Sequence, residues 1–198
     1  MQKLFLASRN AHKTRELAQL LGPDFVLEDL RTHPGISEVL EDGSTFLENA
    51  QLKAATISRQ IPGLVLADDS GLEVDSLGGA PGIYSARYAG EGATDETNRR
   101  QLLAELDRLP VETSRVACFR CVLVLAEGGN VLSAFAGAVS GRILHTERGD
   151  AGFGYDPLFQ PDGFEKSFAE LCAMEKNVVS HRGAAVDQLR LFLKAARH

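Results

Sequence analysis

Apolar and polar positions follow two periods along this chain. Apolar runs of strand length occupy residues 3–7, 25–29 and 64–67. Apolar residues at helical spacing occupy residues 12–21, 45–59, 94–106 and 182–197. Strands that alternate with helices in this order predict an α/β fold.

The second half of the chain adds a different pattern. Two long β-rich runs, residues 115–125 and 131–139, flank Glu127-Gly128-Gly129-Asn130. The central Gly-Gly predicts a tight hairpin turn, so antiparallel strands join the parallel ones in a mixed sheet. Residues 31–44, which are rich in glycine and proline, are predicted as a loop. Ser167-x-x-Glu170 has the spacing of a capping box.

Length, charge and cysteine usage narrow the class of protein. A chain of 198 residues fits a single domain, residues 1–198. A formal net charge of -6 argues against a protein that grips nucleic acid polymers. No apolar run reaches the roughly 20 residues of a membrane helix, so no membrane association is expected. The chain has only three cysteines, which do not form a disulfide framework and favour the reducing cytoplasm. Cys118 and Cys121 are expected on opposite faces of a strand, so they are not expected to share a metal ion.

Adjacent carboxylates follow the apolar run at residues 64–67. Asp68 and Asp69, followed by Ser70-Gly71, stand where that predicted strand ends, and ligands of α/β sheets gather at such ends. Carboxylates suit Mg²⁺, which takes one or two of them together with phosphate oxygens and waters. A polar turn explains the same residues equally well. Glu38, Glu41 and Asp42 in the preceding loop could reach the same metal, or could simply favour the next helix N-terminus.

The connection between the first strand and first helix is cationic. It reads Ser8-Arg9-Asn10-Ala11-His12-Lys13, and helix-start N–H groups with nearby cations can hold phosphate. It lacks the glycines of a P-loop. The alternative is a polar connection in which Asn10 caps the helix.

A third group of residues could hold a base. Phe153-Gly154-Tyr155-Asp156 offers an aromatic ring for stacking, and Lys176, His181 and Arg182 follow with hydrogen-bond donors. Taken singly, Phe153 is equally suited to the core and His181 to a helix cap.

The order of these motifs closely resembles one known family, the non-canonical purine nucleoside triphosphate pyrophosphatases, also called inosine/xanthosine triphosphatases. The resemblance covers nearly the whole chain. Besides the three groups above, it includes Thr45-Phe46-Leu47-Glu48-Asn49-Ala50 and the long run Gly78-Gly79-Ala80-Pro81-Gly82-Ile83-Tyr84-Ser85-Ala86-Arg87.

This resemblance implies a mixed central β-sheet flanked by helices, two lobes with an active-site cleft, and a homodimer. It implies hydrolysis of ITP, dITP and XTP to the monophosphate and pyrophosphate. Asp69 would be the catalytic base, supported by Asp68, and Glu41 and Asp69 would bind Mg²⁺. The implied substrate-binding residues are Ser8, Arg9, Asn10, Ala11, His12, Lys13, Ser70, Phe153, Gly154, Tyr155, Asp156, Lys176, His181 and Arg182.

One residue departs from the family pattern, and other functions stay open. The family has Thr-Gly-Asn where this chain has Ser8-Arg9-Asn10, so Arg9 would be strained if that glycine needs a positive φ. The alternatives are a pyrophosphatase with another base preference, including a pyrimidine-preferring one, a non-catalytic nucleotide-binding regulator, and a structural or partner-binding domain.

Overall fold

The computed structural model describes residues 1–37 and 39–195, which fall into two compact units. Unit 1 comprises Met1–Asp69, Cys121–Gly137 and Arg182–His198, and unit 2 comprises Ser70–Arg120 and Ala138–His181. Each unit is assembled from segments that are distant in the sequence. The two lobes implied by the family resemblance correspond in number to these two units. The prediction that residues 1–198 form a single domain stays a prediction.

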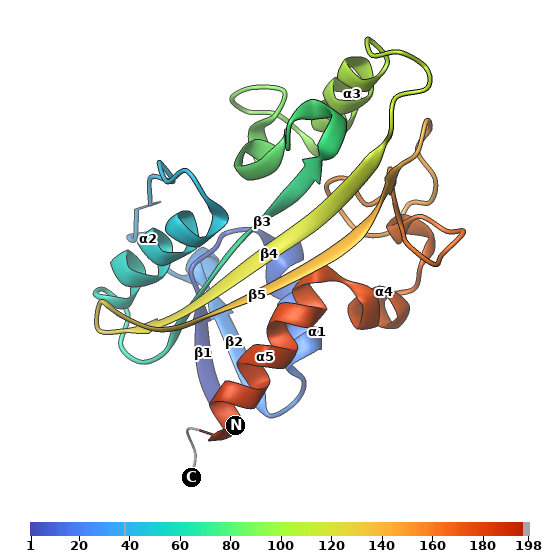
Figure 1. Cartoon of the computed structure of the whole chain (residues 1–198). Coiled ribbons are helices and arrows are strands. Elements are labelled where there is room, and N and C mark those ends of the chain that lie inside the picture. Colours follow the sequence, from blue (N-terminus) through green and yellow to red (C-terminus); the bar gives the residue numbers. More distant parts are fainter. Residues whose placement is uncertain (38, 196–198) are drawn as a thin grey trace. The chain divides into compact units, whose positions relative to one another are not determined.

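The strands form one mixed sheet of six strands in the order β2-β1-β3-β4-β5-β6 (Figure 1). They are β1 (Gln2–Leu6), β2 (Phe25–Asp29), β3 (Val65–Val74), β4 (Val116–Glu127), β5 (Asn130–Ile143) and β6 (Phe159–Pro161). β1 pairs in parallel with β2 and β3, and β5 pairs with β6 in antiparallel fashion. The predicted mixed α/β fold is therefore confirmed.

Five α-helices and four short 3₁₀-helices are found among the described residues. The α-helices are α1 (Ala11–Leu21), α2 (Phe46–Ser58), α3 (Asp95–Leu106), α4 (Ala173–Val179) and α5 (His181–Ala195). The 3₁₀-helices are η1 (Leu30–Thr32), η2 (Asp75–Leu77), η3 (Gly82–Arg87) and η4 (Phe168–Glu170). None of the helices in the described ranges is long and apolar enough to cross a membrane.

Most predicted helices are confirmed to within two residues, and their caps explain where they begin. The N-cap side chains of Asn10, Thr45 and Thr94 accept backbone N–H bonds at the starts of α1, α2 and α3. The Ser167–Glu170 capping box is also present, at η4. Positions 196 and 197 of the last predicted helix lie outside the described residues.

Two predictions of local structure are wrong in part. Residues 31–44 do not begin as a loop, because the Asp29 side chain caps η1 by accepting from Arg31 N. The strand predicted at residues 64–67 does not end before Asp68 but continues to Val74. The buried Leu72 and Val74 alternate with polar residues and extend the strand beyond the carboxylates.

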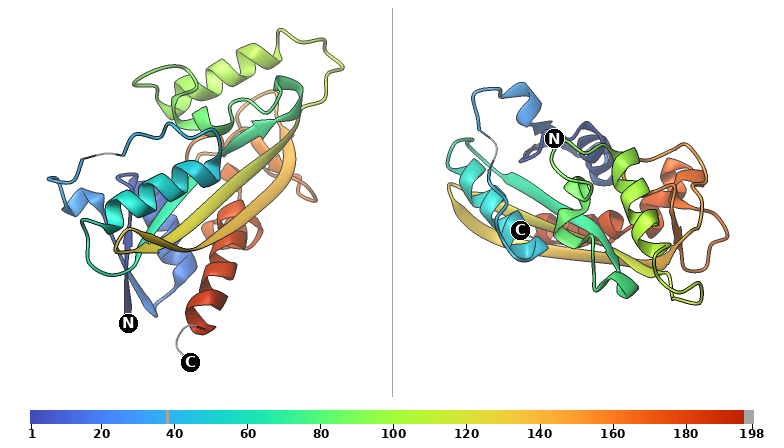
Figure 2. Two further views of the ribbon diagram at one scale, coloured as in Figure 1. Left: turned by 60° about the vertical axis from the view of Figure 1, so that its left-hand side comes forward. Right: turned by 90° about the horizontal axis from the view of Figure 1, so that it is seen from above.

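Alternation along the strands of unit 1 sorts its side chains onto two faces. In β1, Leu4 and Leu6 belong to the core that includes residues of α1 and α5. Phe5 and Ala7 belong instead to the core that includes residues of α2. Figure 1 shows α2 on one side of β1 and α1 and α5 on the other, and Figure 2 gives two further views of the same elements.

Unit 2 has a separate core that is rich in aromatic residues. Phe119 of β4 packs edge-on against Phe159, with ring centroids 4.7 Å apart, and stacks with Phe168 at 5.9 Å. Leu102 and Leu106 of α3 belong to the same core. This core supports the loop that carries the predicted base-binding residues, because Tyr155 is one of its members.

Candidate active site

Asp68 and Asp69 lie on opposite faces of β3 because neighbouring side chains in a strand alternate. Leu66, two residues before Asp68, packs in the core shared with α1 and α5. Ala67, two residues before Asp69, packs in the core shared with α2. The two carboxylates are therefore adjacent in sequence but have different partners.

Asp68 is fully buried and bound by two cations. Arg182 Nε donates to Asp68 Oδ2 at 2.8 Å, and Lys13 Nζ lies 2.6 Å from Oδ1. Burial alone would raise the pKa of Asp68, but the charges of Arg182 and Lys13 outweigh burial and hold the pKa well below its usual range. Asp68 is therefore an ionised group that orients cations.

The same network continues into α1 through the buried Glu16. Its carboxylate accepts from Arg182 Nη1, so Arg182 joins α5 to both α1 and β3. The Cys121 thiol lies 3.5 Å from Asp68 Oδ2, and burial raises the pKa of this thiol well above its usual range. Cys121 is therefore a protonated packing residue.

Asp69 shares a lysine of α2 with Glu41. Lys53 Nζ lies 3.3 Å from Asp69 Oδ1 and 3.1 Å from Glu41 Oε2. It also donates to Asp68 O at 2.9 Å, which fixes it against the β3 backbone. Glu41, Lys53 and Asp69 together are called the carboxylate–lysine cluster below.

The pKa of Asp69 moves in the opposite direction from that of Asp68. Burial raises it, Lys53 and Lys13 oppose the rise, and the charges of Glu41 and Asp68 add to it, so that the pKa is raised overall. Two neighbouring carboxyls whose environments separate their pKa values are typical of an acid–base site. Asp69 is the member of the pair suited to take a proton.

The carboxylate–lysine cluster fits a metal that needs few protein ligands. Asp69 Oδ2 is buried and has no hydrogen-bond partner in the described part of the chain. Within residues 1–37 and 39–195, no three histidine, cysteine, aspartate or glutamate side chains are grouped to hold a metal. Two carboxylates fit Mg²⁺, whose other ligands are phosphate oxygens and waters. Glu38, another of the acidic candidates predicted in this loop, lies outside the described residues.

The predicted phosphate-binding connection is organised by Asn10. Its Oδ1 accepts from His12 N at 2.9 Å and Lys13 N at 3.2 Å, and its own N–H donates to Ser8 Oγ at 3.1 Å. The alternative role of Asn10 as a helix cap is thus the one observed. The cations, rather than these two amides, are the groups suited to phosphate.

Arg9 is not strained, because no residue other than glycine has a positive φ in the described ranges. Its guanidinium donates to Leu30 O at 2.7 Å and to Ile36 O at 2.6 Å. Arg9 thereby binds the segment after β2. This contact gives Arg9 a structural function that a glycine could not have.

The predicted base-binding residues of unit 2 form a second group. Lys176 Nζ lies 2.7 Å from Asp156 Oδ2, and both side chains are buried. The same ammonium lies 5.2 Å from the centroid of the Phe153 ring, which is half-buried. His181 stacks on Phe119 with centroids 4.8 Å apart and planes inclined by 8°.

Backbone contacts fix the loop around Phe153. Phe153 N donates to Asp156 Oδ2 at 2.9 Å, and Gly154 N donates to Asp95 Oδ2 at 2.7 Å. Gly152 could carry no side chain, because a Cβ there would come within 2.0 Å of the Asp156 carboxylate. The half-buried ring is thus presented by a rigid loop.

The long glycine-rich motif supports this loop through Ser85 of η3. Ser85 Oγ accepts from Leu72 N at 2.9 Å and donates to Gly82 O at 2.6 Å. Tyr155 donates its hydroxyl proton to Ser85 O at 2.9 Å. Tyr155 is therefore a buried anchor of the loop.

Arg182 and Ser70 are two predicted substrate-binding residues at the boundaries between the units in the sequence. Arg182 belongs to unit 1, where two of its nitrogens bind Asp68 and Glu16. Ser70 is the first residue of unit 2, immediately after Asp69. The predicted contacts of both residues with substrate stay predictions.

Lys53 and Glu16 were missed by the sequence reasoning, although each leaves a signal. Lys53 falls among the apolar positions of α2 that are buried at Ala50, Ala54 and Ile57. A lysine in such a stripe needs a carboxylate partner. Glu16 stands three residues after Lys13, on the same side of α1.

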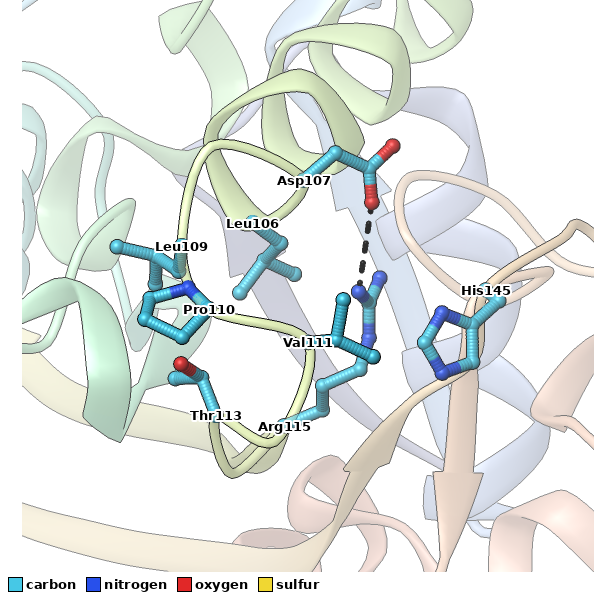
Figure 3. A pocket seen from close by; sticks show the side chains of 8 residues that line it. All are labelled: Leu106, Asp107, Leu109, Pro110, Val111, Thr113, Arg115 and His145. Carbon is cyan, nitrogen blue, oxygen red and sulfur yellow. Dashed lines mark ion pairs between the residues drawn. The ribbon is translucent and has the colours of Figure 1, made fainter.

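A cavity of about 250 Å³ lies elsewhere in unit 2 (Figure 3). It is bordered by the ion pair of Asp107 and Arg115, whose closest atoms are 3.6 Å apart. Arg115 also donates to Ile143 O and Leu144 O. None of the predicted site residues is among those that line this cavity.

Comparison with known proteins agrees with the motifs. A protein of Geobacter sulfurreducens called dITP/XTP pyrophosphatase is 50% identical over 192 residues, which cover 96% of each chain. One of Shouchella clausii with the same name is 43% identical and also covers 96% of each. A HAM1 protein structure from Coxiella burnetii superposes with a TM-score of 0.87 at 38% identity, covering 98% of this chain and 100% of that one.

The family assignment follows from the extent of these matches. Residues 4–192 match the Ham1 family, and this range includes all of unit 2, most of unit 1 and every predicted site residue. The chain belongs to the Ham1 family.

Proposed function

We propose that this protein hydrolyses ITP, dITP and XTP to the monophosphate and pyrophosphate. Support comes from its membership in the Ham1 family and from relatives named dITP/XTP pyrophosphatase. The observation that carries the proposal is the different environment of two adjacent carboxyls, with the pKa of Asp68 lowered and that of Asp69 raised.

Asp69 is the general base in this proposal. Its raised pKa brings it nearer to neutrality, where a base is most effective. It takes a proton from a water that attacks the α-phosphorus, and pyrophosphate leaves. Lys53, bound to both carboxylates of the cluster, holds the base in place.

Glu41 and Asp69 would hold Mg²⁺. When bound, the ion neutralises charge on the triphosphate oxygens. Asp69 Oδ2, which has no hydrogen-bond partner among the described residues, supports this ligand assignment. The identity of the ion as Mg²⁺ belongs to the proposal.

Phosphate binding is assigned to residues 8–13 and to Ser70. Lys13 is the chief cation, and Asp68 orients it through their 2.6 Å ion pair. The Lys13 side chain is 17% exposed, so its ammonium can donate to a phosphate oxygen as well. It stabilises the charge that develops on the leaving pyrophosphate.

Base recognition is assigned to Phe153, Gly154, Tyr155, Asp156, Lys176, His181 and Arg182. The half-buried Phe153 ring offers a stacking face, and donors of the group bind the carbonyl at position six of hypoxanthine or xanthine. Adenine presents an amino donor there and leaves those donors unpaired. A site of this kind rejects such an analogue by about 10⁴-fold.

Hydrolysis of dITP in ¹⁸O-labelled water tests the proposed reaction. We expect equal amounts of dIMP and pyrophosphate, with the label in dIMP, because water attacks the α-phosphorus. Asp69→Asn should abolish turnover and leave the melting temperature and circular dichroism spectrum intact. Release of orthophosphate, label in pyrophosphate, or near-normal turnover by Asp69→Asn would contradict the mechanism.

The expected homodimer and the cytoplasmic location stay predictions. Sedimentation of the purified protein measures the first, and fractionation of cells measures the second.

A further inference from the structure

Asn49 of α2 is buried beside the carboxylate–lysine cluster, and no substrate or metal role is assigned to it above. It has no exposed surface. It stands four residues before Lys53, so the two side chains lie on the same face of the helix. Lys53 in turn binds Glu41 and Asp69.

The Asn49 side chain holds the segment that carries Glu41. Gly43 N donates to Asn49 Oδ1 at 2.8 Å, two residues after Glu41. Glu48 supports the same segment by accepting from Ser44 N at 2.7 Å. The backbone after Glu41 is therefore fixed to the first turn of α2.

The contact between Gly43 and Asn49 is too close for any other residue at position 43. A Cβ on Gly43 would lie 2.7 Å from Asn49 Oδ1 and 2.8 Å from Glu48 Cβ. The φ of Gly43 is not in the left-handed region, so close approach rather than backbone conformation calls for glycine there.

Stability alone does not explain an asparagine at this position. Asn49 Nδ2 is buried and has no hydrogen-bond partner among the residues that the structure describes. A buried amide without a partner costs free energy that an apolar side chain would avoid. Such local violations are typical of functional positions.

We propose that Asn49 is a positioning residue that sets Glu41 at the correct distance from Asp69 to share a metal ion. This inference rests on the proposed function, in which Glu41 and Asp69 hold the ion. Asparagine supplies a neutral acceptor, whereas aspartate would add a carboxylate near the two already present. Residues that orient metal ligands typically change metal affinity by about 10-fold to 100-fold when they are replaced.

Asn98 of α3 provides a matched control. It is also a buried asparagine near a helix start, and its Oδ1 accepts from Ala89 N at 2.8 Å. Its Nδ2 donates to Ala86 O at 3.1 Å. Asn98 therefore holds a loop in the same manner, but it belongs to unit 2, whereas the carboxylate–lysine cluster belongs to unit 1.

The test measures Mn²⁺ binding by electron paramagnetic resonance and the exchange of the Gly43 amide proton by NMR, both without nucleotide. We expect Asn49→Ala to weaken Mn²⁺ binding by about 10-fold or more and to speed exchange at Gly43. Asn98→Ala should keep wild-type Mn²⁺ affinity even if it melts at a lower temperature. Asn49→Asp retains the acceptor oxygen for Gly43 N and should keep exchange at Gly43 slow.

A second pair of variants tests the contact between Gly43 and Asn49 by changing the glycine instead of the asparagine. Gly43→Ala should weaken Mn²⁺ binding, because its methyl group displaces the segment from Asn49. Gly35→Ala should not, because nothing lies within 4 Å of a Cβ at that position. These variants leave Asn49 unchanged, so they do not create the cavity that Asn49→Ala would leave at this buried position of α2.

Each outcome supports or overturns the positioning role. Wild-type Mn²⁺ affinity in Asn49→Ala or Gly43→Ala would overturn it, as would equal weakening in Asn98→Ala, or fast exchange at Gly43 in Asn49→Asp. If the wild-type protein itself bound no Mn²⁺, the proposed metal site would fail. Binding by the wild type with no effect of Asn49→Ala would refute the positioning role alone.

Discussion

Neighbouring side chains on a strand point in opposite directions, and at Asp68 and Asp69 this separates two chemical tasks. Asp68 meets Arg182 and Lys13, which keep it ionised. Asp69 meets Lys53 beside Glu41, and its pKa is raised. The sequence motif identified the acidic pair, but only the assignment of strand faces distinguishes the group that orients cations from the group that takes a proton.

Asp68→Asn should destabilise the protein by roughly 3 to 5 kcal/mol, because it leaves buried cations without their carboxylate. The folded pKa of Asp68 lies below the ordinary value of 3.8, so its contribution is present above pH 3.8 and is lost as the pH falls through the lower, folded value. Urea unfolding at neutral and acidic pH measures both effects. The variant should lose less stability on acidification than the wild type does.

The control for this prediction is Glu28→Gln, which removes an exposed ion pair with Lys3. That pair has side chains that are 38% and 66% exposed, so its loss should change stability by less than about 1 kcal/mol. Equal stability of Asp68→Asn and the wild type would contradict the buried network.

Lys53→Met should move the acidic limb of the pH profile of kcat/KM to higher pH. After burial, Lys53 has the largest influence on the pKa of Asp69, and it lowers that pKa. Without it the base stays protonated to higher pH, and the rate should fall by about 10²-fold or more. Lys3→Met is the surface control. An unchanged acidic limb in Lys53→Met would contradict the assignment of Asp69 as base.

At the scale of elements, local chemistry accounts for most boundaries. The predicted hairpin between β4 and β5 is confirmed, and Gly128 and Gly129 adopt φ values of 57° and 88°. Asn10, Thr45 and Thr94 cap the helices that follow them. Local signals fail at β3, whose length depends on packing of Leu72 and Val74 in the core of unit 2.

Gly128→Ala should destabilise the hairpin by roughly 1 to 2 kcal/mol, because alanine disfavours the left-handed conformation that the turn requires. Space is not the reason, since nothing lies within 4 Å of a Cβ at Gly128. Thermal and urea unfolding, with Gly35→Ala as the glycine control at ordinary φ, measure the effect. Equal stability of the two variants would show that the turn tolerates alanine.

For the whole molecule, the motifs in their order predicted the fold class and named the candidate site residues, and the roles of those residues stay predictions. The ion-pair partners of these residues could not be predicted, because each ion pair joins residues that are distant in the sequence. Arg182 pairs with Glu16 across 166 positions, and Lys53 with Asp69 across 16. Which segments form each of the two units could not be predicted for the same reason, because each unit combines segments that are separated in the sequence.

The most direct test of the central claim compares kcat/KM of the wild-type protein, with Mg²⁺, for dITP, ITP, XTP, GTP, ATP, dTTP and UTP. The account predicts that dITP, ITP and XTP exceed ATP by about 10⁴-fold, with pyrophosphate as a product and no turnover when Mg²⁺ is removed. A preference for ATP, dTTP or UTP, or equal rates without a metal ion, would contradict it.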